Sequence, residues 1–316
     1  MIKRAKFLSK VGGVLLLFGS VLFFIAFAAS GFSFKTISGL DATAKSEELP
    51  ICDSITVNVD TSNVKIIFDD SAELITLKHE ELTDSNGELI RKFNVSYENG
   101  KISVNEWESL KSELYLFDFH ISQIELTIPS SLAVALNVTT DTGDVSLSGN
   151  GNLKKSSFET DTGDVVTTSA IIKSSESITF LTDTGDIYLG KLNTGAVLIE
   201  TNTGDILLEE KITASTVSVK SDTGDIDAIA DIITNALSVN IKNGDFESSA
   251  IIDAMEISAS LWNGDIEVAL IGESADYTVI LNVHNGDANI QSGGNGARRL
   301  NVKSNSGDIE IKFRSR

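Results

Sequence analysis

The dipeptide Gly-Asp recurs nine times along this chain, at steps of 19 to 22 residues. A nearly constant period of this length is typical of repeat proteins, in which every unit is one small supersecondary element. A glycine at the same place in each unit predicts a tight turn, because glycine adopts positive φ without a Cβ clash. The nine predicted turn glycines are Gly143, Gly163, Gly185, Gly204, Gly224, Gly244, Gly264, Gly286 and Gly307.

Apolar residues alternate with polar residues on both sides of each of these glycines. Around Gly204, for example, Val197 and Ile199 precede the turn, and Ile206 and Leu208 follow it. Alternation with a period of two is typical of a β-strand that buries one face. Each unit is therefore expected to consist of a strand, a turn and a second strand.

A single unit of about 20 residues cannot bury its own apolar face, whereas stacked units form a continuous core. The pattern therefore predicts an all-β fold, a parallel β-solenoid of ~20-residue coils over residues 131–316, with equivalent side chains in columns ~4.8 Å apart. A meander of antiparallel hairpins is the alternative topology, because Thr-Gly-Asp between two strands also suits a hairpin. The constant period and the repeated apolar columns favour the solenoid.

The region before the regular repeats, residues 51–130, is less uniform. Residues 60–64 match residues 161–165, with Ser-Asn in place of Gly-Asp, and this match predicts a degenerate first coil. Terminal repeats of a solenoid are usually atypical, so we expect irregular capping β coils over 51–130. The aromatic stretch 105–120 is expected to plug the open end of the core, or alternatively to form an edge that binds a partner.

The N-terminus carries a signal for the membrane. Four bases and no acid stand in residues 1–10, and an uncharged stretch follows at 11–34. This length and charge pattern predicts a cytoplasmic tail, one transmembrane helix, a stalk over 35–50 and an extracytoplasmic remainder, hence a single-pass protein of the cell membrane. A cleaved signal peptide ending near Ala26-Phe27-Ala28 is the alternative.

Charge and cysteine content exclude several classes of function. The chain has 45 Asp and Glu against 25 Lys and Arg, a net charge of −20, which argues against a nucleic-acid partner. The only cysteine, Cys52, excludes an intrachain disulfide and any site built on several cysteines. A lone cysteine fits a secreted bacterial protein better than a eukaryotic ectodomain.

Residues 124–147, followed by the Thr/Asn-Gly-Asp-Ile repeats, resemble the bacterial "putative adhesin" family of domains of unknown function, which includes LiaG-like cell-envelope proteins. The resemblance covers residues 51–316. It implies a β-strand-repeat domain outside the cytoplasm, commonly behind an N-terminal anchor, and no established catalytic activity.

An Asp follows every repeat glycine, and a second Asp often stands two residues before it. Stacked coils would place these carboxylates ~5 Å apart, where each pair repels by about 1 kcal/mol in water. We expect each Asp to accept backbone N–H groups of its own turn. The alternative is that Ca²⁺, the only cofactor considered, lies between the rows. Its candidate ligands are Asp141, Asp144, Asp161, Asp164, Asp183 and Asp186.

The position two residues before the glycine changes character along the chain. It is mostly acidic in the early repeats and becomes Lys242, Trp262 and His284 in later ones. In a sequential stack these three residues would lie close together, where they could stack on a sugar ring or seat a side chain of a partner. The alternative is ordinary variation on a solvated edge.

Catalytic motifs are absent from the sequence. It contains no phosphate-binding glycine loop, no HExxH and no Ser-His-Asp spacing, and the even repeats leave no long loops to build a cleft. We therefore expect no enzyme, but a binding, adhesion or scaffold module of the bacterial envelope, with envelope stress as one setting. Its partner would be an envelope protein or glycan. The alternative is a polysaccharide-acting β-helix enzyme.

Overall fold

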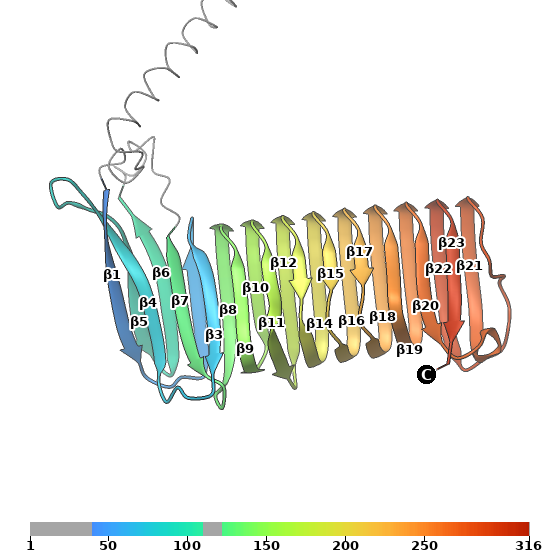
Figure 1. Cartoon of the computed structure of the whole chain (residues 1–316), viewed down its shortest axis with the longest axis horizontal. Coiled ribbons are helices and arrows are strands. Elements are labelled where there is room, and N and C mark those ends of the chain that lie inside the picture. The colour runs from blue at the N-terminus through green and yellow to red at the C-terminus, as the bar shows by residue number, and fades with distance from the viewer. Residues whose placement is uncertain (1–39, 110–121, 316) are drawn as a thin grey trace, which may run out of the picture. The chain divides into compact units, whose positions relative to one another are not determined.

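The computed structural model describes residues 40–109 and 122–315, which form β-strands and one short 3₁₀ turn, η2 (Ser274–Asp276) (Figure 1). The strands of the N-terminal half are β1 (Leu40–Leu49), β2 (Ser54–Val59), β3 (Asn63–Asp69), β4 (Ile75–Asp84), β5 (Leu89–Glu98), β6 (Lys101–Glu108), β7 (Gln123–Pro129), β8 (Ala133–Thr142), β9 (Val145–Leu153), β10 (Ser156–Thr162) and β11 (Val165–Ser174).

The remaining strands are β12 (Ser177–Thr184), β13 (Ile187–Leu189), β14 (Lys191–Thr203), β15 (Ile206–Leu208), β16 (Ile212–Thr223), β17 (Ile226–Ala228), β18 (Ile232–Asn243), β19 (Phe246–Asn263), β20 (Ile266–Ile271), β21 (Tyr277–Asn285), β22 (Arg298–Ser306) and β23 (Ile309–Arg314).

Contacts divide the chain into two compact units. The described part of the smaller unit comprises residues 40–44, 80–92 and 107–109. In it, β4 pairs antiparallel with β5 through Leu82 and Arg91, and Leu40, Leu82 and Ile90 form a small buried cluster.

The larger unit is the solenoid, comprising residues 45–79, 93–106 and 122–315 of the described chain. Its coils stack in parallel and in register: Val197 on β14 faces Val217 on β16, which faces Leu237 on β18. The short strands after the turns stack in the same way, as β13, β15 and β17 do. The predicted all-β parallel solenoid is confirmed, and parallel pairing excludes the antiparallel meander for these coils.

The core consists of the predicted columns. Val197, Ile199, Ile206 and Leu208, the apolar positions of one coil, are all at most 3% exposed. Their counterparts in neighbouring coils belong to the same continuous cluster of buried residues. Burial of these columns is the main stabilising contribution, because a single coil would expose its apolar face.

The order of the coils in space departs from their order in sequence at both ends. Strand β2 pairs with β6 on one side and with β8 on the other. At the C-terminal end, β22 lies between β19 and β21 (Figure 1). The first and last coils of the sequence are therefore flanked by other coils on both sides.

Several predictions fall on residues outside this description. The transmembrane helix over 11–34 and most of the aromatic stretch 105–120 belong to them, so both stay predictions. Within residues 40–109 and 122–315, no helix is long and apolar enough to cross a membrane. Residues 40–49, predicted to lie in the stalk, form strand β1.

Candidate functional site

The repeat glycines sit at the corner between the two strands of each coil. All nine have φ between +133° and +155°, a conformation that residues with a Cβ avoid. The coils also approach closely here: a Cβ on Gly224 would lie 1.9 Å from the carbonyl oxygen of Gly204 in the preceding coil. Glycine is therefore required both by the backbone conformation and by the stacking of the coils.

The Asp after each glycine takes part in a hydrogen-bonded ladder. The Oδ1 atoms of eight of these nine carboxylates, all but that of Asp287, accept the backbone N–H of the corresponding Asp in the adjacent coil, at 2.6–2.9 Å. In spatial order the ladder runs through Asp144, Asp164, Asp186, Asp205, Asp225, Asp245, Asp265, Asp308 and Asp287. Its first acceptor is the side chain of Asn63, which receives the N–H of Asp144 at 2.8 Å.

This ladder differs from the expected hydrogen bonds within each turn. The carboxylates do accept backbone N–H groups, but from the neighbouring coil, because parallel stacking brings that N–H within reach. Hydrogen bonds to an ionised acceptor are the stronger kind and offset repulsion along the row. The Asp side chains thus link successive coils instead of closing their own turns.

A buried Thr column stabilises the same corner from inside. The hydroxyls of Thr160, Thr182 and Thr201 donate to the carbonyl oxygens of the repeat glycines Gly143, Gly163 and Gly185, at 2.9 to 3.1 Å. On the outside, the hydroxyl of Tyr188 donates to Oδ2 of Asp186 at 2.8 Å, and this bond raises the pKa of Tyr188 to about 12.

The six predicted calcium ligands lie in the rows at these corners, where Asp164 and Asp186 are half-buried and the other four are exposed. Asp144, Asp164 and Asp186 use Oδ1 in the ladder, and Asp183 accepts a hydrogen bond from Asn202 at 2.8 Å. In the described parts of the chain, no group of three or more His, Cys, Asp or Glu side chains is arranged to hold a metal ion. Calcium binding at these residues stays a prediction.

The second predicted row, two residues before the glycines, is ordered differently from the sequence. Lys242 forms an ion pair with Asp222 of the preceding coil. Trp262 is 63% exposed. Because β22 lies between β19 and β21, the pairing places Asn305 between Trp262 and His284. The prediction that Trp262 and His284 are neighbours on this row is therefore wrong. We call the row Lys242, Trp262, Asn305 and His284, in which Asn305 is half-buried and the other three are exposed, the aromatic row.

The sequence reasoning missed a further acidic row. Asp227, Glu247, Glu267 and Glu310 are neighbours on successive coils, three residues after their glycines. Burial and the surrounding carboxylates raise the pKa values of Asp227 and Glu247. Lys312 forms ion pairs with Glu267 and Glu310. An acid at the same outward position of four repeats was the signal that could have revealed this row.

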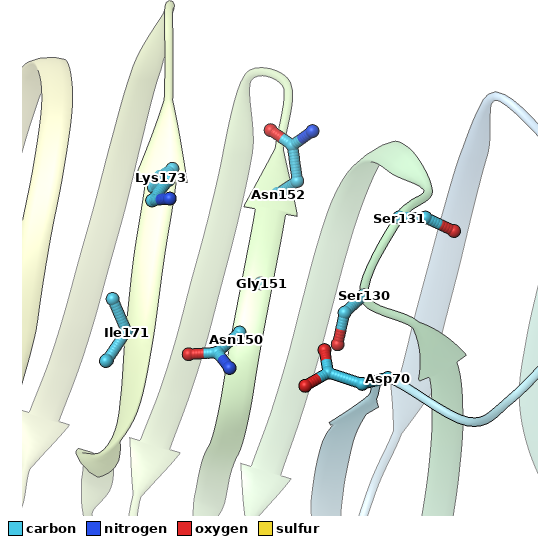
Figure 2. A pocket seen from close by; sticks show the side chains of 8 residues that line it. All are labelled: Asp70, Ser130, Ser131, Asn150, Gly151, Asn152, Ile171 and Lys173. Atoms are coloured by element: carbon cyan, nitrogen blue, oxygen red, sulfur yellow. The ribbon is translucent and has the colours of Figure 1, made fainter.

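Two hollows lie where strands of neighbouring coils run side by side. The first, about 420 Å³, is called the polar groove here (Figure 2). The residues that line it are Asp70, Ser130, Ser131, Asn150, Gly151, Asn152, Ile171 and Lys173. The second, about 440 Å³, is lined over β14, β16, β18 and β19 by residues that include Thr213, Ile233, Asp253 and Met255.

Sequence reasoning did not find the polar groove. Asn150 and Asn152 come from β9, and Ile171 and Lys173 come from β11. Asp70 follows β3, and the two serines follow β7. No motif links these segments, since they are distant in sequence and meet only in the stack.

The chain is similar to several solved bacterial proteins. One is described as a putative adhesin from Bacteroides fragilis, with 14% identity, a TM-score of 0.45 and coverage of 86% of this chain and 97% of the other. Another is described as a putative lipid binding protein from Parabacteroides distasonis, with 12% identity, a TM-score of 0.42 and coverage of 86% and 97%.

A third is described as a putative cell adhesion protein from Clostridium sporogenes, with 12% identity, a TM-score of 0.26 and coverage of 87% of this chain and 100% of the other. No curated protein matches the chain. The family described as Toastrack DUF4097 matches residues 52–315, which includes nearly all of the described β-structure. The chain belongs to the Toastrack DUF4097 family, within the bacterial adhesin-like domains of unknown function that its sequence resembles.

Proposed function

We propose that this chain is a binding or adhesion module of the bacterial cell envelope, held at the membrane by residues 11–34. The observation that carries the binding role is the exposure of Trp262, 63%, within the aromatic row. An exposed indole leaves apolar surface in contact with water and gains no packing contacts in exchange. Trp is also among the residue types most enriched at the hot spots of protein interfaces.

The surroundings of Trp262 support an interface. Asn305 lies on the adjacent coil and His284 on the coil after it, and both add hydrogen-bonding groups to the same row. Lys242, on the other side, forms an ion pair with Asp222 of the preceding coil. Pre-positioned side chains on a rigid sheet lose little conformational entropy when they bind.

The binding role is tested by retention on isolated cell walls. The full-length chain, kept in detergent micelles, is mixed with detergent-washed bacterial cell walls and sedimented. We expect the wild type to sediment with the walls and Trp262→Ala to bind at least tenfold more weakly, because truncating an interface Trp costs about 2 kcal/mol or more. Tyr97→Ala is the matched control, since Tyr97 on β5 is also an exposed aromatic residue, at 48%, and lies outside the aromatic row.

Equal retention of wild type and Trp262→Ala, or no retention of the wild type, would overturn the proposed role of the aromatic row. Shortened glycan chains after the incubation would instead favour a polysaccharide-cleaving activity. The two outcomes are separated by measuring glycan length in the supernatant.

The membrane attachment is tested by protease accessibility. The uncharged span 11–34 and the four bases before it support an N-terminus in the cytoplasm. Protease added to intact spheroplasts should digest the β-solenoid and leave a short membrane-bound fragment. Full-length protein that survives the protease, or a mature N-terminus near Ala29 in the medium, would contradict the anchor.

A further inference from the structure

We propose that the polar groove binds a saccharide of one or two residues. This inference deepens the proposed binding function, on which it rests, by assigning a second site and a ligand class. The volume of about 420 Å³ falls within the range of small-ligand pockets, about 300–1,000 Å³.

The groove gathers polar groups that the protein leaves without partners. In the described chain, no hydrogen bond or ion pair joins the side chains of Asp70, Asn150, Asn152 or Lys173 to another residue. The hydroxyl of Ser130 is buried and also has no hydrogen-bond partner among the described residues. A buried hydroxyl without a partner is unfavourable, so a ligand group that reaches it when the Ser130 side chain rotates gains more than one that meets an exposed hydroxyl.

Neighbouring polar residues outside the groove behave differently. Asp69, directly before Asp70, accepts bonds at 2.7 Å from both the backbone N–H and the hydroxyl of Ser71. These bonds lower the pKa of Asp69, so this carboxylate serves the local turn. Asp70 has no such role, and in Figure 2 its carboxylate lies beside Ser130 on the side of Asn150.

The strands hold the groove residues at fixed spacings. Asn150 on β9 pairs with Ile171 on β11, and Asn152 pairs with Lys173. Paired residues stand about 4.8 Å apart across the strands, and residues two apart on one strand are separated by about 6.6 Å. The two amides, the ammonium group and one apolar side chain are thus held at regular spacings on a rigid sheet.

This set of groups matches the chemistry of a sugar. Hydroxyls donate and accept at once, so they can bond both the carboxylate of Asp70 and the amides of Asn150 and Asn152. Ile171, 39% exposed, offers an apolar contact for the C–H face of a pyranose ring. A phosphate or other anion is disfavoured by the unpaired Asp70 carboxylate, which would repel it.

The experiment is saturation-transfer NMR on the full-length chain in detergent micelles. The probes are glucose, galactose, N-acetylglucosamine, maltose, cellobiose and N,N′-diacetylchitobiose. We expect transfer to at least one probe, and at least tenfold weaker affinity for Asp70→Ala and for Lys173→Ala, since sites built on hydrogen bonds to hydroxyls lose affinity steeply. Asn240→Ala, an exposed Asn on β18 outside the groove, is the control for Asn150→Ala.

Each outcome decides the assignment. Circular dichroism of every variant checks that the coils are folded. Ser130→Ala, which removes only the hydroxyl oxygen, is the groove substitution that disturbs the packing least. No transfer to any probe, or transfer that persists in Asp70→Ala, Lys173→Ala and Asn150→Ala, would overturn the groove assignment. Retention on cell walls through Trp262 would still stand in that case, whereas loss of wall retention with intact sugar binding would overturn the aromatic row alone.

Discussion

The carboxylate of Asp265 accepts the backbone N–H of Asp308 at 2.6 Å, although Asp287 is the next repeat aspartate in the sequence. Asp308 in turn accepts the N–H of Asp287 at 2.8 Å. The last coil of the sequence is therefore inserted before the coil that precedes it, and Asp287 stands at the end of the ladder.

The order of the coils in the stack predicts different stability effects for the same substitution at two equivalent repeat residues, Asp265 and Asp287. Asp265→Ala leaves the N–H of Asp308 without its charged acceptor and is expected to lower the free energy of unfolding by about 1–2 kcal/mol. Asp287→Ala removes no ladder acceptor of a described coil and should change it by less than about 0.5 kcal/mol. Urea unfolding followed by circular dichroism measures both. Equal losses would contradict the inserted coil, because a sequential stack makes both carboxylates acceptors.

A second prediction isolates the close approach of the coils at the turn. Gly224 and Gly293 have φ of +139° and +138°, but only Gly224 has a neighbour that a Cβ would meet. Alanine at either position strains the backbone by about 1–3 kcal/mol. Gly224→Ala must also displace the coil of Gly204, so its loss of unfolding free energy should be clearly the larger of the two.

The same urea titrations provide the measurement. Asp225→Ala, which removes one ladder bond, is expected to cost of order 1 kcal/mol and so less than Gly224→Ala. If Gly224→Ala and Gly293→Ala lose equal free energy, the contact with Gly204 does not limit the stacking.

A third prediction concerns pH and the acidic row. Burial, followed by the nearby carboxylates of Asp225, Asp205 and Asp245, raises the pKa of Asp227 above its ordinary value of 3.8. The folded state therefore holds the proton of the Asp227 carboxyl more tightly than the unfolded state does. The free energy of unfolding falls as pH rises from the pKa of the unfolded state through the higher pKa of the folded state. The penalty is fully present near about pH 7 and absent at about pH 3.

Asp227→Asn should accordingly raise the melting temperature at neutral pH, and the gain should disappear in acid. Glu210→Gln removes the same charge from an exposed position outside the row and serves as the control. A gain of the same size from Glu210→Gln would show that net charge, not the row, sets the effect.

A fourth prediction concerns cations at Asp141, Asp161 and Asp183. Because the ladder satisfies the adjacent carboxylates of Asp144, Asp164 and Asp186, we expect chelator to leave the melting temperature unchanged. Ca²⁺, Mg²⁺ and NaCl at equal ionic strength should raise it equally, by screening alone. A stabilisation specific to Ca²⁺, measured by scanning calorimetry, would assign a calcium site, since flexible carboxylate sites prefer the larger ion.

The sequence by itself determined what each coil looks like. Alternation around Gly204 is a local property of the strand, and Val197, Ile199, Ile206 and Leu208 are buried as it predicts. The positive φ of the glycine is equally local. A constant period then leaves stacking as the way to bury every coil, so fold class followed from the residues alone.

Only the tertiary structure decided which coil lies beside which. Every repeat presents the same apolar columns, so the local pattern fits any neighbour equally well. The insertion of β22 between β19 and β21 separates Trp262 from His284 and could not be read from the repeats. The hydrogen bonds of the Asp ladder differed from those expected for a related reason. In the stack, each Asp carboxylate lies within reach of a backbone N–H of the adjacent coil, and the repeat pattern does not show which coil is adjacent.

The polar groove shows the same limit most clearly. Asp70, Ser130, Asn150 and Lys173 belong to different coils, and each looks like an ordinary surface residue in its own segment. Parallel stacking brings them together because β9 lies beside both β3 and β11. Local alternation fixes which side chains point outward, whereas the order of the stacked coils fixes which outward side chains meet.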